Sequence, residues 1–327
     1  MSLRPRAQDT AAPDATGHSR GVPPKGGGGG AQVGVHAAAK WSFLGPALAV
    51  LVALRLVPLL LVVGLSFTDL NLARPQDPVS FVRLDNYVDL VQSRAFREVL
   101  ATTGVIVLPA LAIEMVVGLA IALWLNTLIR GRAIARSVLL VPFLLTPVVI
   151  GTFFKMFYSA ALGQLNYFLG AIGVTDGDTA WLTHPRVVRW AVVAMEAWHT
   201  IPFVALLCLA GVVSLPQEPL EAARVDGASA WQRFRYVMLP ILAPLLLVVL
   251  CLRALDILQL FDEVYVLTGG GPGRLTEVYN IFLYNRGFQT FELGYTSAAA
   301  VLLMLTVSSI VLIAWAFVRV RRWRLAG

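Results

Sequence analysis

The chain has 327 residues, of which 57% are hydrophobic and only 14% are charged. Soluble domains average about 25% charged residues, so this composition argues against a soluble protein and indicates a membrane protein. The formal net charge of +7 does not indicate a nucleic-acid-binding protein. The arginines cluster beside the apolar segments, not on a soluble face with interleaved aromatic residues.

Residues 1–40 form a segment rich in Gly, Pro and Ala, with PPKGGGGG at 23–30. The segment has almost no large apolar side chain, so burial cannot offset the entropy that ordering would remove. We expect a disordered tail on the cytoplasmic side of the membrane. The glycines beside Lys25 do not form a phosphate-binding loop, because the sequence has no G-x-x-x-x-G-K-[ST] spacing.

Residues 41–327 are predicted to form one transmembrane permease domain. A helix needs ~20 mostly apolar residues to cross the hydrocarbon layer, and six runs reach that length. The predicted fold is therefore an all-α polytopic membrane protein with six transmembrane helices. The spans are expected at about 43–66, 99–125, 134–159, 187–212, 238–262 and 296–318.

The distribution of Lys and Arg predicts the orientation of these spans. Fifteen such residues fall in the tail, in the two loops on the same side as the tail and at the C-terminal end, whereas six fall in loops on the opposite side. Positively charged loops stay in the cytoplasm, so both termini are predicted to be cytoplasmic.

Ionisable residues within or beside the apolar runs predict a polar pathway. Each costs at least ~2.5–3.5 kcal/mol in the membrane unless it faces protein or water. Prolines such as Pro147 break the same runs, which is tolerated at membrane depth where the chain lines a cavity. Alternatively, Arg253 and Asp256 neutralise each other on one helix face, and Arg55 and Lys155 extend to the interface or pair with a neighbour. The ionisable residues are Arg55, Glu114, Lys155, Glu196, His199, Arg253 and Asp256.

A polar cytoplasmic segment lies between the predicted fourth and fifth spans. Pro219 favours a helix start and Gly227 permits a left-handed turn, so two short helices that meet at Gly227 are predicted. The small side chains of Ala222 and Ala223 let another surface approach closely, and Glu221 lies near the positive end of the first helix. We therefore expect this segment to dock another protein; the alternative is an ordinary amphipathic loop.

The spacing within this segment is distinctive. EAA stands at 221–223, Gly227 follows after three residues, and VMLP stands at 237–240 after nine more. This pattern resembles the EAA loop, here 213–237, of the membrane subunits of bacterial ABC importers, with Val237 where the family usually has Ile. The resemblance implies coupling helices that dock on a cytoplasmic ATPase. The implied contacts are Glu221, Ala222, Ala223, Asp226 and Gly227.

Three further stretches narrow the resemblance. LDNYVDL at 84–90, VYVLTGGGPGRLTE at 264–277 and IFLYNRGFQTFELGYTSAAA at 281–300 are similar to carbohydrate permeases of the maltose-permease first-subunit kind. The likeness covers about residues 43–322. It implies the type I permease fold and a subunit that forms half of the pathway of an ATP-driven importer, for a disaccharide such as trehalose or maltose.

The resemblance also implies the partners and the location of the chain. A homologous second permease, two cytoplasmic ATPase subunits and an extracytoplasmic sugar-binding protein would complete the importer in a bacterial cell membrane. ATP and Mg would bind the ATPase subunits, so no catalytic site, cofactor or metal is expected on this chain. The absence of a Walker motif from the sequence agrees with that division.

In the maltose-permease relative, the sugar contacts lie on the spans before and after the coupling loop. An ungapped count from the glutamate of EAA and from the LP pair carries them to eight positions here. Several are charged where the relative carries amides and small or apolar residues. The implied contacts are Glu196, His199, Thr200, Phe203, Arg253, Asp256, Ile257 and Leu260.

Three other functions are weighed against a sugar importer. Arg253 can meet a phosphate, as in a glycerol-phosphate or other polyol importer, but nearby carboxylates would repel a dianion. A membrane enzyme is disfavoured, because the four histidines are scattered and no H-E-x-x-H, G-x-S-x-G or paired-Cys motif occurs in the sequence. A homomeric channel or scaffold would have no use for the EAA loop.

Overall fold

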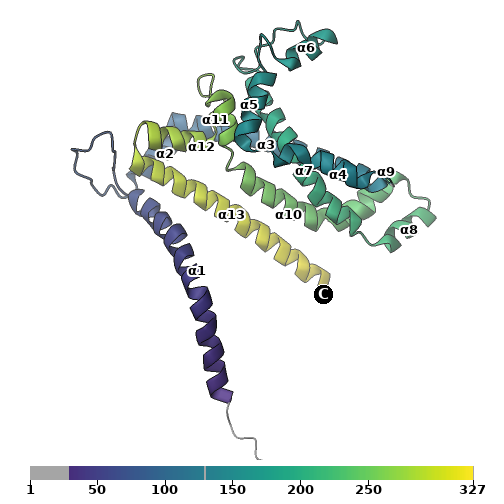
Figure 1. The fold of residues 1–327 in the computed structure, drawn as a ribbon, viewed down its shortest axis with the longest axis horizontal. Coiled ribbons are helices and arrows are strands. Elements are labelled where there is room, and N and C mark those ends of the chain that lie inside the picture. Colours follow the sequence, from purple (N-terminus) through teal and green to yellow (C-terminus); the bar gives the residue numbers. More distant parts are fainter. Residues whose placement is uncertain (1–28, 129, 327) are drawn as a thin grey trace, which may run out of the picture. The chain divides into compact units, whose positions relative to one another are not determined.

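The computed structural model describes residues 29–128 and 130–326 (Figure 1). The chain divides into two units, residues 1–58 and 59–327. Helix α1 crosses from the first unit into the second. Its bounds and those of the first helices of the second unit are α1 Gly29–Leu65, α2 Asp85–Gln92, α3 Arg94–Thr127, α4 Arg132–Leu144, α5 Pro147–Phe157, α6 Gln164–Ala171 and α7 Val188–Val213.

The second half of the chain carries the remaining helices, including two π-helical segments. Each π-helical segment follows directly on a short α-helix. The bounds are α8 Gln217–Val225, α9 Ala230–Arg233, η1 Phe234–Met238, α10 Leu239–Ile257, α11 Asp262–Thr268, α12 Tyr279–Tyr284, η2 Asn285–Gln289 and α13 Leu293–Ala326.

Helix α1 begins earlier than the sequence predicts. It starts at Gly29, so the last part of the predicted tail is helical, while residues 1–28 lie outside the described residues. The stretch Leu44–Leu65 is long and apolar enough to cross a membrane, and none of its side chains is buried. Exposed apolar side chains along this stretch suit a lipid environment.

The predicted spans correspond to five long apolar helices and one bent pair in the described part of the chain. The third predicted span, 134–159, is not one straight helix. It consists of α4 and α5, which are bent by 89° at a short break. Pro147 explains the break, because the residue before a proline is driven out of the helical region. Thr146 and Leu145 are accordingly extended, with ψ of 147° and 145°.

Helices α3 and α7 supply the centre of the second unit. In the first half of each helix, Ile106 of α3 and Met195 of α7 pack with α5 and α11. Toward the other end of α7, Val204 and Cys208 pack with α3 and α10. Because α7 takes part in both clusters, its position fixes α5, α10 and α11 around the same region.

Candidate functional site

A buried ionic cluster joins three of the long helices. The Arg253 guanidinium on α10 donates to both carboxylate oxygens of Glu114 on α3, at 2.8 and 3.1 Å, and to Glu196 Oε1 on α7, at 2.9 Å. Arg253 and Glu114 are only 1% and 0% exposed. A charge without a partner at this depth would be very costly, so this cluster ties the three helices to one arrangement.

Asp256 lies one turn after Arg253 and forms an ion pair with it. The pair that the sequence predicted on one helix face is therefore present. The Asp256 side chain is nevertheless 67% exposed, whereas Glu114 is fully buried. Glu114 is thus the principal partner of the guanidinium, and Asp256 remains open to a neighbouring group.

A cavity of about 320 Å³ lies beside this cluster. Its wall comes from α7, from the end of α10 and the start of α11, and from the break between α4 and α5. Its wall combines polar and apolar side chains, which is typical of small-molecule sites. The lining residues are Phe143, Leu145, Pro147, Glu196, His199, Thr200, Asp256, Ile257, Gln259, Leu260, Phe261, Asp262 and Glu263.

The structure brings six of the eight predicted contact residues to this cavity: Glu196, His199, Thr200, Asp256, Ile257 and Leu260. The other two lie behind the wall. Phe203 stacks on Phe143, with ring centroids 4.7 Å apart, and Phe143 is the ring that lines the cavity. Arg253 is buried behind Glu196, and its guanidinium is paired with Glu114 and Glu196.

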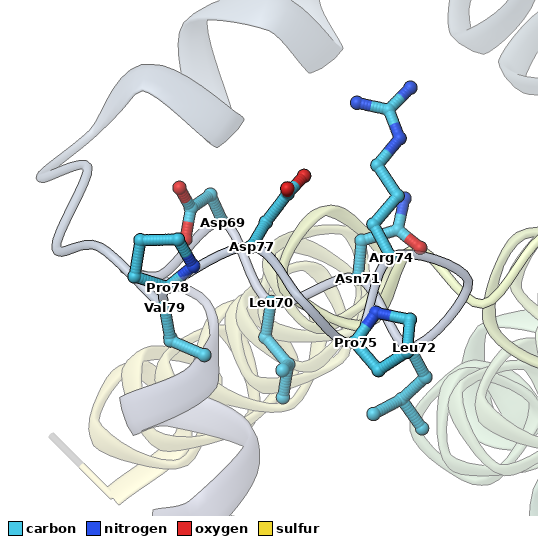
Figure 2. A pocket seen from close by; sticks show the side chains of 9 residues that line it. All are labelled: Asp69, Leu70, Asn71, Leu72, Arg74, Pro75, Asp77, Pro78 and Val79. Carbon is cyan, nitrogen blue, oxygen red and sulfur yellow. The ribbon is translucent and has the colours of Figure 1, made fainter.

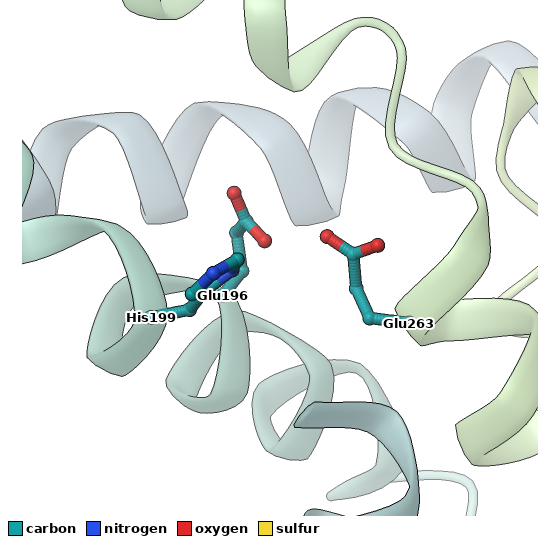
Figure 3. Close-up of side chains that lie close together, drawn as sticks. All are labelled: Glu196, His199 and Glu263. Atoms are coloured by element: carbon teal, nitrogen blue, oxygen red, sulfur yellow. The ribbon is translucent and has the colours of Figure 1, made fainter. Parts of the chain in front are cut away.

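Glu196, His199 and Glu263 form a second polar cluster in the wall. Their potential ligand atoms all lie within 4.8 Å of one another, and all three residues are buried. Figure 3 shows Glu196 and His199 on one helix, with Glu263 facing them from another segment. The sequence predicted no metal site, but a carboxylate, an imidazole and a second carboxylate at this spacing are a possible cation-binding set.

The polar segment 213–237 folds as two short helices around Gly227. Helix α8 begins at Gln217, so Pro219 lies inside its first turn, where its missing N–H is not needed. After α8, Gly227 adopts φ +76°. The Ala228 N–H donates to Ala223 O, and the Gly227 N–H donates to Arg224 O, which together make a Schellman turn.

The residues after this turn begin α9 with a capping box. Ser229 accepts from the Gln232 N–H, and the Gln232 side chain accepts from the Ser229 N–H. Large apolar side chains nearby are exposed, namely Val225, Trp231 and Tyr236. Exposed apolar side chains gathered on one small segment are typical of a protein-docking surface.

Comparison with known proteins identifies the family. A family model described as "Binding-protein-dependent transport system inner membrane component" matches residues 33–325. The chain belongs to this family. The protein is therefore a multi-pass membrane permease, a transport component with the type I permease fold.

Curated relatives of the permease include two that are named for sugars. The trehalose/maltose transport system permease protein MalF of Thermococcus litoralis is 34% identical over 250 residues, which cover 76% of this chain and 82% of the relative. The trehalose transport system permease protein SugA of Mycobacterium tuberculosis is 36% identical over 268 residues, which cover 82% and 84%.

Solved structures support the fold of the permease. A chain from a bacterial ABC transporter involved in the import of the acidic polysaccharide alginate superposes with a TM-score of 0.73 at 24% identity. The superposition covers 87% of this permease and 96% of that chain. At this identity the likeness concerns the fold alone.

Sequence reasoning missed Glu263 as a site residue of the permease. The predicted contacts were carried over only to the spans on either side of the coupling loop, whereas Glu263 lies just beyond, in α11. Gly151 of α5 determines how closely α11 approaches. A Cβ atom at residue 151 would lie 2.7 Å from the Glu263 backbone oxygen, so only glycine allows the observed contact.

Replacing Gly151 by alanine is expected to destabilise the permease by about 1–3 kcal/mol, because the added methyl group forces α5 and α11 apart. The measurement is the thermal unfolding midpoint of the purified permease in detergent. Gly104→Ala in α3 is the matched control, because a Cβ there meets nothing within 4 Å. This control should be neutral or slightly stabilising. Equal thermal midpoints for the two variants would contradict the close contact between Gly151 of α5 and Glu263 of α11.

Proposed function

We propose that the permease is one membrane-spanning subunit of an ATP-driven importer and forms half of the pathway for a neutral sugar. A disaccharide such as trehalose or maltose is the proposed substrate. The observation that carries the proposal is the polar cavity among apolar helices, in a chain that is 34–36% identical to permeases named for these sugars.

The chemistry of the cavity wall suits a sugar. Carboxylates, an imidazole, a hydroxyl and the Gln259 amide supply acceptors and donors for hydroxyl groups. The aromatic rings of Phe143 and Phe261 supply apolar surface for the C–H face of a sugar ring. The cavity volume of about 320 Å³ lies within the range of small-molecule sites.

The same wall disfavours a phosphorylated polyol. Four carboxylate side chains line the cavity, those of Glu196, Asp256, Asp262 and Glu263. No Lys or Arg is among the lining residues, and the Arg253 guanidinium is already paired with Glu114, Glu196 and Asp256. With no metal ion bound to these carboxylates, a phosphate dianion would therefore meet net repulsion.

A homologous second permease would complete the pathway. Asp256 is largely exposed although it lies at the end of a membrane-spanning helix, and Gln259 beside it is also exposed. Exposure of an ionised side chain to lipid costs several kcal/mol, about 2.5–3.5 at the centre of the bilayer. A partner surface that covers this side of the cavity removes that cost.

Two cytoplasmic ATPase subunits would supply the energy, with ATP and Mg bound on them. The proposed docking surface is α8, the Gly227 turn and α9, with the contacts Glu221, Ala222, Ala223, Asp226 and Gly227. Closure of the ATPases would move this segment and tilt the attached helices, so that the cavity opens alternately to each side. Docking to this segment requires both termini to lie in the cytoplasm.

An extracytoplasmic binding protein would deliver the sugar from the opposite side. The loop after α1 has a hollow of about 300 Å³, and Figure 2 shows its lining side chains. Asp69, Arg74 and Asp77 give this hollow charges of both signs. Such a surface suits a transient polar contact with a soluble protein.

The test is ATP hydrolysis by the purified complex in lipid, with its binding protein and a panel of disaccharides. We expect one neutral disaccharide to stimulate hydrolysis and glycerol phosphate to have no effect. In the same preparation, Thr200→Val should raise the sugar concentration for half-maximal uptake about two- to tenfold, because one hydrogen bond is lost.

Thr306→Val is the matched control. Thr200 and Thr306 each lie in a long helix and donate to the carbonyl four residues earlier, at 2.7 and 2.8 Å, but only Thr200 lines the cavity. Equal uptake by both variants would argue against the cavity as the sugar site. Failure of any ATPase to co-purify would overturn the importer assignment and favour a channel.

A further inference from the structure

The cluster of Glu196, His199 and Glu263 contains polar atoms that the fold does not satisfy. Glu196 Oε1 accepts from Arg253, whereas Glu196 Oε2 and His199 Nδ1 are buried without a hydrogen-bond partner among the described residues. The two residues are only 3% and 8% exposed. Buried polar atoms normally have a partner, so these two indicate a ligand.

The local charges identify the sign of that ligand. Three buried carboxylates, those of Glu114, Glu196 and Glu263, lie near a single guanidinium. Arg253 uses its donors on Glu114, Glu196 and Asp256, and it makes no ion pair with Glu263. Excess negative charge in a buried wall is neutralised either by protonation of a carboxylate or by a bound cation. The imidazole nitrogen of His199 beside it, which has no partner in the described part of the chain, favours the cation.

The donor set favours a transition-series ion. Magnesium and calcium prefer oxygen ligands alone, whereas one imidazole nitrogen with two carboxylates suits zinc or manganese. With metal–ligand bonds of about 2.0–2.2 Å, two ligand atoms on one ion lie at most ~4.4 Å apart. The observed limit of 4.8 Å is close to that value, so small side-chain rotations would complete the site.

We propose that Glu196, His199 and Glu263 form a binding site for a divalent transition-metal cation in the wall of the cavity (Figure 3). The ion would join α7 to α11, which carry these ligands. Its remaining coordination positions would face the cavity that the three residues line. A sugar hydroxyl could occupy one of these positions, and this step alone rests on the proposed function.

The experiment uses the full complex without a histidine tag, stripped with a chelator and titrated with zinc or manganese. Metal content is measured by mass spectrometry after gel filtration, and affinity by calorimetry. We expect one ion per permease, with affinity lowered at least tenfold in Glu263→Gln and His199→Gln. Asp262→Asn is the matched control, because Asp262 lines the same cavity but lies outside the cluster. This control should bind the metal normally.

The proposal would be overturned if the wild-type complex retained neither metal. It would also be overturned if Glu263→Gln bound both metals with the same affinity as the wild type. If the variants fail to fold, X-ray absorption of the metal-loaded wild type decides. One nitrogen and two oxygen ligands from protein support the site, and an all-oxygen or sulfur shell refutes it. Metal binding is read separately from sugar-stimulated ATP hydrolysis, so either result stands without the other.

Discussion

Replacing Arg253 by methionine is expected to destabilise the permease by about 3–5 kcal/mol. The change removes the donors that Glu114 receives from α10 and leaves a fully buried carboxylate without its cation. It also frees Glu196 Oε1, so two of the long helices lose their polar contact with α10. The measurement is the unfolding free energy, or the thermal midpoint, of the purified complex in detergent.

Two variants separate this effect from a general loss of charge. Arg94→Met removes an arginine from the exposed pair with Glu98, where the loss should be below about 1 kcal/mol. In the double variant Arg253→Met with Glu114→Leu, removal of the stranded charge should restore part of the stability. Two results would contradict the role assigned to the cluster. In the first, Arg253→Met and Arg94→Met have the same thermal midpoint. In the second, the double variant is no more stable than Arg253→Met alone.

The ionic cluster shows what the sequence could and could not specify. The cost of a charge in an apolar helix predicted that Glu114, Glu196 and Arg253 would face protein or water. The sequence could not predict the partners, because Arg253 and Glu114 are separated by 139 positions and meet only through the packing of α3 against α10. Short-range spacing favoured the pair of Arg253 with Asp256, which exists, although the Asp256 side chain is largely exposed.

The sequence predicted a break in the third span but not the angle of the bend. Pro147 interrupts an apolar run, which predicted a broken helix at a cavity. The 89° bend depends on the extended residues before Pro147 and on the packing of α5 against α11. Tertiary packing also explains why the sequence did not predict Glu263. This residue reaches the cavity because α11 comes soon after α10 and lies against Gly151.

Replacing Gly227 by valine is expected to abolish co-purification of the proposed ATPase partner and to reduce sugar uptake at least tenfold. A β-branched residue at φ +76° costs about 1–3 kcal/mol, which is enough to open the Schellman turn between α8 and α9. Nothing lies within 4 Å of the added Cβ atom, so the change acts through the backbone of this segment and not through the membrane core. The measurement pairs ATPase retention on a tagged permease with sugar uptake in vesicles.

Gly173→Val supplies the matched control for the coupling segment. Gly173 has a nearly equal φ of +72° and likewise meets nothing within 4 Å, but it lies after α6, on the side that the charge distribution predicts to be external. The strain is therefore the same, and only its place in the chain differs. ATPase retention should be normal in Gly173→Val and lost in Gly227→Val. Equal retention in both variants would show that the turn at Gly227 is not needed for docking, and the EAA segment would then be an ordinary amphipathic loop.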